Sequence, residues 1–183
     1  MEFFYDDDEL ERANFYRLFS SLFIRDPVDL TLIEIEDIFG LKFHDTANEI
    51  RADFTHLFSE PAGHLPPYES LYNYPLWDKP RLWGKATEEV QRFYQSSGIV
   101  IDEETDIIPD HISAELLFMS YLIDNGYIEH QKRFLQNHLF AWIPLYCDEV
   151  KRQALTSFYK QIASLLREFI VIECEEFGII RGQ

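Results

Sequence analysis

A histidine and a glutamate four residues apart form the clearest chemical pairing in the sequence. His111 and Glu115 lie in residues 110–123, whose apolar spacing predicts a helix. A separation of four places both side chains on one helical face, which Phe118 and Leu122 continue. An ionisable pair on a buried helix is unfavourable unless it is hydrogen-bonded. Three interpretations stay open: structural hydrogen bonding, the polar floor of a binding pocket, and metal or acid–base catalysis.

The other reactive side chains show weaker patterns. His130 and His138 are eight residues apart and share a face of a predicted helix, but no nearby carboxylate completes a site. Ser70 has no base beside it in the sequence, and neither a G-x-S-x-G motif nor a glycine-rich phosphate loop occurs. Cys147 and Cys174 show no paired spacing, which favours two buried, reduced thiols. We therefore expect no catalytic residue, no metal site and no cofactor.

Helical spacing runs through almost the whole chain, and no segment alternates with the period of a strand between hairpin turns. With 183 residues, the chain is predicted to be all-α, a single-domain helical bundle spanning 1–183. About seven to nine helices are expected. They cover about 8–24, 26–39, 45–58, 87–98 with Thr87 as its cap, 110–123 with Asp110 as its N-cap, 128–139, a helix that Pro144 starts, and 155–178.

Residues 59–84 interrupt this pattern with one long loop rich in aromatic residues and proline. They hold five of the eight prolines, two of the three tryptophans and three tyrosines. Long aromatic loops are usually packed and functional, although an irregular lid over the core is the simpler alternative. Together with the helix start at Asp110–Glu115, the loop predicts an apolar groove with acidic points. Such a groove suits a peptide that carries apolar and basic residues.

The chain carries 33 acidic against 16 basic side chains, a formal net charge of −17, and 16% of its residues are aromatic. This charge disfavours nucleic acid and anionic membranes as partners, because both are polyanions. It favours a basic partner, or it simply keeps an apolar protein in solution. The acidic N-terminus lacks the pattern of a secretory signal, and no stretch approaches 18 uninterrupted apolar residues. The expected location is the cytoplasm, without direct membrane insertion.

Several segments resemble, in order and spacing, the TorD/DmsD/NarJ family of molybdoenzyme maturation chaperones. They are DFTHLFSEP at 53–61, PYESLY at 67–72, PDHISAELLFM at 109–119, FLQNHL at 134–139, WIP at 142–144 and FY at 158–159. The resemblance covers roughly residues 14–172. It implies a cytoplasmic, non-enzymatic helical protein that binds the twin-arginine signal peptide, or an N-terminal segment, of a molybdopterin oxidoreductase catalytic subunit. Such chaperones assist cofactor insertion and assembly before export, and some form homodimers by domain swapping.

The resemblance also implies a peptide-binding site. Asp110 and His111 match the Asp-His of the family, which is implicated in peptide recognition, and Tyr68 stands where some members carry Trp. The complete predicted site comprises Tyr68, Glu69, Ser70, Tyr72, Trp77, Asp110, His111 and Glu115. Replacing Asp110 or His111 by Ala is expected to lower peptide affinity and to leave the helical fold largely intact. The rival hypotheses are a helical metal-dependent hydrolase using His111 and Glu115, and a stable accessory subunit of a redox complex.

Overall fold

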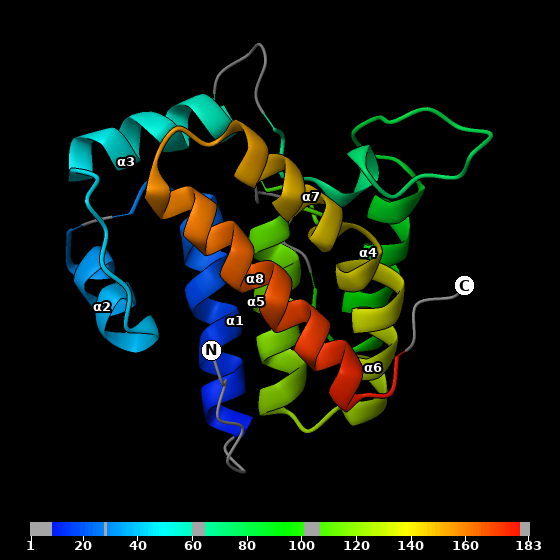
Figure 1. The fold of residues 1–183 in the computed structure, drawn as a ribbon. Coiled ribbons are helices and arrows are strands. Elements are labelled where there is room, and N and C mark those ends of the chain that lie inside the picture. The colour runs from blue at the N-terminus through cyan, green and yellow to red at the C-terminus, as the bar shows by residue number, and fades with distance from the viewer. Residues whose placement is uncertain (1–8, 28, 60–64, 101–106, 180–183) are drawn as a thin grey trace.

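The chain folds into a bundle of helices in the computed structural model, which describes residues 9–27, 29–59, 65–100 and 107–179 (Figure 1). These residues form eight α-helices, a 3-10 turn and two π-helical turns, which confirms the predicted all-α class. The α-helices are α1 (Glu9–Ile24), α2 (Asp29–Phe39), α3 (Ala47–Phe54), α4 (Lys85–Ser96), α5 (Ile112–Asp124), α6 (Ile128–Phe134), α7 (Phe140–Gln153) and α8 (Ser157–Glu176). The shorter turns are η1 (Thr55–Ser59), η2 (Glu69–Leu71) and η3 (Leu135–Leu139).

Helix α5 lies at the centre of the bundle, as its apolar surface predicts. Nine of its thirteen residues are buried, and α1 packs along it. Helix α8 packs on α7 and passes in front of α5 in the view of Figure 1. The core between these helices is aromatic, and Phe19, Phe169 and Trp142 are all completely buried in it. Burial of this apolar surface provides the main favourable free energy of folding.

The helix boundaries differ from the sequence-based expectation around Pro144. This residue lies inside α7 and does not start a helix. Helix α6, the π-helical turn η3 and α7 follow one another without a gap from residue 128 to residue 153. A proline disturbs the regular hydrogen-bond pattern of a helix, and π-helical turns occur at such irregularities. A local change of helical pitch therefore takes the place of the break that was expected between residue 139 and Pro144.

Two predicted caps are wrong, and both residues have another role. Helix α4 begins at Lys85, with Gly84 as its N-cap, so Thr87 lies inside the helix. His111 is the N-cap of α5, and its side chain accepts a hydrogen bond from the Ser113 amide. Thr87 and Asp110 are instead hydrogen-bonded to each other in the interior.

The cysteine prediction is confirmed, because Cys147 and Cys174 are both buried and neither forms a disulfide. Burial raises the pKa of the Cys147 thiol far above its usual range, which keeps this thiol protonated and unreactive. Among the helices of the described segments, none is both long and apolar enough to cross a membrane.

Candidate functional site

The aromatic loop and the start of α5 are joined through their backbones. Tyr68 and His111 form an isolated antiparallel β-bridge, the one such bridge in the described residues. The Glu69 amide donates to the Asp110 carbonyl over 2.9 Å, and the Ile112 amide donates to the Pro67 carbonyl over 2.8 Å. The structure therefore brings together the two segments that the sequence analysis combined into one site.

Asp110 fastens this junction from inside the protein. Its side chain is completely buried. One carboxylate oxygen accepts from the Ser70 amide over 2.8 Å, and the other accepts from Thr87 Oγ1 over 2.9 Å. The carboxylate thus ties η2, α4 and the start of α5 to one another, and it faces away from solvent.

His111 is the partly exposed member of the Asp-His pair. Its Nδ1 accepts the Ser113 amide over 3.1 Å, and its ring packs edge-on against Tyr68 with centroids 5.1 Å apart. Burial lowers the pKa of His111 to about 4, although the charge of Asp110 opposes this effect. The imidazole is consequently neutral near pH 7 and caps α5 as a hydrogen-bond acceptor.

Glu115 lies in the interior on the same face of α5. Its Oε2 accepts from Trp142 Nε1 over 3.0 Å, whereas its buried Oε1 accepts no hydrogen bond from a described residue. Burial, followed by the negative charge of the adjacent Glu69 carboxylate, raises the pKa of Glu115 far above its usual range. A protonated Glu115 can donate from Oε1 to Glu69, which satisfies both carboxyl groups.

Glu69 has a further buried partner that the sequence analysis missed. His138 on η3 lies with Nδ1 2.9 Å from one Glu69 oxygen and 3.1 Å from the other. Asn73 Nδ2 donates to the same carboxylate over 2.6 Å. The expectation that no carboxylate accompanies His138 is therefore wrong, because its partner lies 69 residues away in the sequence. The sequence did contain an indication that His138 has a partner. This histidine lies on the apolar face of a helix, between Phe134 and Trp142, where a buried polar group requires a hydrogen-bond partner.

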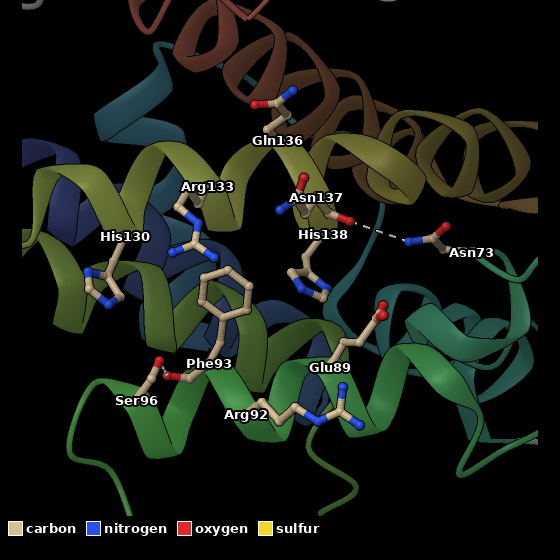
Figure 2. Close-up of a pocket in the computed structure, with 10 residues that line it drawn as sticks. All are labelled: Asn73, Glu89, Arg92, Phe93, Ser96, His130, Arg133, Gln136, Asn137 and His138. Atoms are coloured by element: carbon tan, nitrogen blue, oxygen red, sulfur yellow. Dashed lines mark hydrogen bonds between the residues drawn. The ribbon is translucent and has the colours of Figure 1, made fainter.

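His138 also lines a polar pocket between α4 and the helical run of residues 128–139 (Figure 2). The pocket has a volume of about 770 Å³. His130, Arg133 and His138 point into it from one side, as expected for residues that share a helical face. The Arg133 guanidinium lies 5.5 Å from the centre of the Phe93 ring on α4. Arg92 also lines it and pairs with Glu88 over 3.5 Å, so the basic groups are partly neutralised.

A second pocket, of about 490 Å³, is mostly apolar and lies between α1, α5 and the chain around residues 99 and 107–109. Its apolar lining comprises Ile24, Tyr94, Ile99, Ile107, Pro109, Ala114, Leu117, Phe118 and Tyr121. Leu117 is 54% exposed, which makes it the exposed large hydrophobic residue of this otherwise central helix. Arg17 and Asp124 form an exposed ion pair among the remaining lining residues. This pocket begins one residue from the Asp110–His111 pair, at Pro109.

The predicted site residues differ in exposure and position. Glu69, Ser70, Asp110 and Glu115 are buried beneath the junction, whereas Tyr68 and His111 are partly exposed on it. Tyr72 is stacked on Trp142 with ring centroids 5.6 Å apart, and burial raises the pKa of Tyr72 to about 12. Trp77 is not brought to the others, since it is 82% exposed on the far part of the loop.

His111 and Glu115, which the sequence analysis considered as a pair, make separate contacts in the structure. Each side chain bonds a different partner, the Ser113 amide and the Trp142 indole respectively. Within the described ranges, no three His, Cys, Asp or Glu side chains are grouped as metal ligands. Of the three interpretations, the observed contacts are those of the structural one.

Comparison with known proteins places these features in a family. The family described as nitrate reductase delta subunit matches residues 24–148. "Chaperone protein TorD" of Vibrio parahaemolyticus is 29% identical over 143 residues, which cover 71% of this chain and 65% of that protein. TorD of a Psychrobacter species is 30% identical over 150 residues, covering 74% and 65%. The "perchlorate reductase assembly chaperone protein" of Dechloromonas aromatica is 30% identical over 100 residues, covering 48% and 45%.

These alignments span between 45% and 65% of the length of the relatives. The fold is also found in the crystal structure of a putative redox enzyme maturation protein from Archaeoglobus fulgidus. That structure matches with a TM-score of 0.63 at 21% identity and covers 93% of this chain and 98% of its own. The matched residues 24–148 include both the loop and the Asp-His helix start, and this chain therefore belongs to the TorD/DmsD/NarJ family.

Proposed function

We propose that this protein is a maturation chaperone that binds the twin-arginine signal peptide, or an N-terminal segment, of a molybdopterin oxidoreductase catalytic subunit. It acts in the cytoplasm as a binding protein without catalytic activity and holds the client until its cofactor has been inserted. The observation that carries this proposal is the apolar pocket beside the Asp110–His111 junction, in a chain of this family. The names of two relatives, a TorD chaperone and a reductase assembly chaperone, support the same role.

The apolar pocket fits the apolar part of such a peptide. Leu117, Ile24 and Ile107 expose aliphatic surface at its rim, and Phe118 and Tyr94 form deeper walls. A leader segment that buries its own apolar side chains here gains the hydrophobic free energy of both surfaces. Aliphatic and aromatic walls without a fixed pattern of hydrogen bonds accept different apolar sequences equally well. This property suits a chaperone that recognises a leader peptide by its hydrophobicity and not by one exact sequence.

The ion pair at the pocket supplies a site for the basic part. Asp124 is the last residue of α5, where the helix dipole places partial negative charge. Its carboxylate is held by Arg17, and both side chains are exposed. An arginine of the leader can replace Arg17, because guanidinium–carboxylate pairs form bidentate hydrogen bonds and an exposed pair is weak. Immediately before Ile107, the sequence adds acidic residues at 102, 103, 104 and 106.

In this proposal, some residues of the predicted peptide-binding site contact the peptide and others position the site. We assign direct contact to the partly exposed Tyr68 and His111. Asp110, Glu69 and Ser70 act as positioning residues, because their hydrogen bonds hold the loop against the start of α5 from the interior. Glu115 is a positioning residue as well, because it bonds Trp142, on which Tyr72 of the loop is stacked. Substituting a positioning residue changes binding only through the shape of the site. Variants of exposed pocket residues therefore test the site more cleanly.

Leu117→Asp is the sharpest of these variants. Leu117 is exposed, so the change perturbs the fold little, but it puts a charge into the apolar pocket. We expect a fall of at least about tenfold in affinity for a twin-arginine leader peptide, measured by calorimetric titration. Leu145→Asp is the matched control, because Leu145 is 59% exposed on α7 and does not line the pocket. Equal affinities of the two variants, each folded by circular dichroism, would contradict this assignment of the site.

A further inference from the structure

Residues 74–83, which we call the Trp loop, project from the bundle beside α4 (Figure 1). Five large apolar side chains of this loop are exposed: Tyr74, Leu76, Trp77, Leu82 and Trp83. Leu76 is fully exposed, and Trp77 and Trp83 are 82% and 60% exposed. Several exposed aromatic and aliphatic side chains on one projecting loop indicate a surface that binds a membrane or another molecule.

The base of the Trp loop is held firmly although its tip is free of the core. On one side Tyr72 stacks on the buried Trp142. On the other side Gly84 packs so closely that an added Cβ would lie 3.3 Å from the Ser70 Cβ and 3.1 Å from the Arg81 carbonyl oxygen. Trp83 adopts a φ of 58°, a left-handed conformation that is unfavourable for a bulky residue. The anchored base maintains this conformation and keeps the tip pointing outward.

The charge of the Trp loop is opposite to that of the whole protein. Residues 74–83 contain Lys79 and Arg81 against Asp78, a surplus of one positive charge in a chain of net charge −17. Arg81 and Asp78 form an ion pair of 3.4 Å. Lys79 and Arg81 lie between the two exposed apolar pairs of the loop. The combination of exposed Trp, Tyr and Leu with basic residues is typical of segments that lie at the interface of a membrane.

We propose that the Trp loop docks this protein peripherally on anionic lipid surfaces, with the tryptophans at the level of the headgroups. A projecting tip can enter a fluid interface without bringing the rest of the molecule into contact with it. A standard protein partner needs roughly 800 Å² on each side, which calls for a broad complementary surface and not a narrow projection. Attraction of the basic residues adds to burial of the apolar tip.

The sequence analysis disfavoured anionic membranes as partners because the chain is acidic. The acidic composition nevertheless does not oppose a contact through the Trp loop. Electrostatic repulsion is screened over about 8 Å at physiological salt, so charges far from the tip act only weakly. The tip itself carries a surplus of one positive charge. No transmembrane helix is required, since the contact is confined to the interface. The inference extends beyond leader binding and does not depend on it.

Vesicle binding of the full chain tests the proposal. Of its three tryptophans, Trp142 is buried and the other two belong to the Trp loop, so tryptophan fluorescence reports on the loop directly. With phosphatidylcholine vesicles containing about 30% phosphatidylglycerol, we expect co-sedimentation and a blue shift of the emission. Brominated lipids should quench this emission. Binding to pure phosphatidylcholine should be at least about tenfold weaker, because the attraction of the basic residues is missing.

Two variants separate the contributions while both reporter tryptophans stay in place. Leu76→Ser with Leu82→Ser should lower binding to anionic vesicles about tenfold or more. Lys79→Gln with Arg81→Gln should remove the preference for anionic lipid. Leu155→Ser is the control, because Leu155 is 71% exposed outside the loop, and it should bind as the wild type does.

Three outcomes would overturn the proposal. The first is the absence of both sedimentation and blue shift for the wild type with anionic vesicles. The second is wild-type binding by the Leu76/Leu82 variant. The third is loss of a protein partner, and not of vesicles, on substitution of these two leucines, which would identify the loop as a protein interface. Leader-peptide titration of the same variants keeps this question separate from the proposed chaperone function.

Discussion

At the scale of single residues, the interior of the site is organised around two carboxyl groups that cannot both be charged. Glu69 is surrounded by His138, Asn73 and Glu115, whereas Glu115 has Trp142 as its donor. Two adjacent carboxylates in a dry interior favour binding of a proton. The raised pKa of Glu115 identifies it as the group that holds this proton.

Glu115→Gln tests this arrangement through the pH dependence of stability. The folded state binds the proton of Glu115 more tightly than the unfolded state, whose pKa is near 4.5. Glu115 therefore stabilises the fold fully below that pH, and its contribution is lost as pH rises toward the raised folded pKa. Gln keeps an acceptor for Trp142 and a donor for Glu69 but does not ionise. Relative to the wild type, the variant should gain at least about 1 kcal/mol between about pH 5 and pH 8.

Urea unfolding at several pH values measures this difference. Glu129→Gln on the exposed surface of α6 is the control, and its difference from the wild type should stay nearly constant. A Glu115→Gln variant whose stability difference does not change with pH would mean that Glu115 does not carry the proton.

Sequence reasoning reached part of this arrangement. The spacing of His111 and Glu115 correctly predicted a shared helical face, because helical periodicity is local. It could not identify Trp142, His138 or Glu69 as partners, because each of these contacts joins residues that are 27 or more positions apart. A polar residue on an apolar face shows that a partner is needed, but only the packing of helices determines which one.

At the scale of elements, one buried aspartate holds the site together. Asp110 links the 3-10 turn η2 to α4 and to the start of α5. The sequence predicted Asp110 as the N-cap of α5, but His111 caps the helix and Asp110 forms these interior hydrogen bonds instead. The sequence analysis predicts that Asp110→Ala leaves the helical fold largely intact. These contacts indicate instead that the substitution destabilises the fold.

Asp110→Ala should instead lower the free energy of unfolding by about 2 to 4 kcal/mol, because it leaves the Ser70 amide and the Thr87 hydroxyl buried without an acceptor. Thr87→Val removes only one of the two hydrogen bonds, so its effect should be smaller. Asp37→Ala on the exposed surface of α2 controls for loss of an acidic residue. Urea denaturation compares all three, and wild-type stability of Asp110→Ala would show that the junction is not a structural tie.

The helices themselves were largely predictable, and their interruptions were not. The ends of α1 and α8 followed from amphipathic spacing within a few residues. The uninterrupted run from α6 to α7 did not, because local spacing does not show that Pro144 lies inside a helix or that η3 is a π-helical turn. Both α7 and η3 pack against α8. The long loop of residues 59–84 was expected to line a groove with the start of α5. Its residues 67–70 do join the start of α5, but the Trp loop projects from the bundle.

At the scale of the whole molecule, the net charge of −17 has a kinetic consequence. A strongly acidic protein attracts a cationic peptide over distances beyond direct contact, and this raises the association rate. Salt screens the attraction, so we expect the rate constant for a twin-arginine leader to fall about tenfold between about 50 mM and about 500 mM NaCl.

Stopped-flow fluorescence over this range of salt measures the effect. A leader whose two arginines are replaced by alanine should show a weaker dependence, because fewer charges are attracted. An association rate that does not change with salt would assign the acidic surplus to solubility alone.

The most direct measurement of the central claim is calorimetric titration of the wild-type protein with twin-arginine leaders. The panel should contain leaders of trimethylamine oxide, dimethyl sulfoxide and nitrate reductase catalytic subunits. We predict saturable one-to-one binding of at least one leader, weakened by Arg→Ala changes in its arginine pair and by Leu117→Asp in the apolar pocket. Absence of binding to all of these leaders, or binding that neither change affects, would contradict the account.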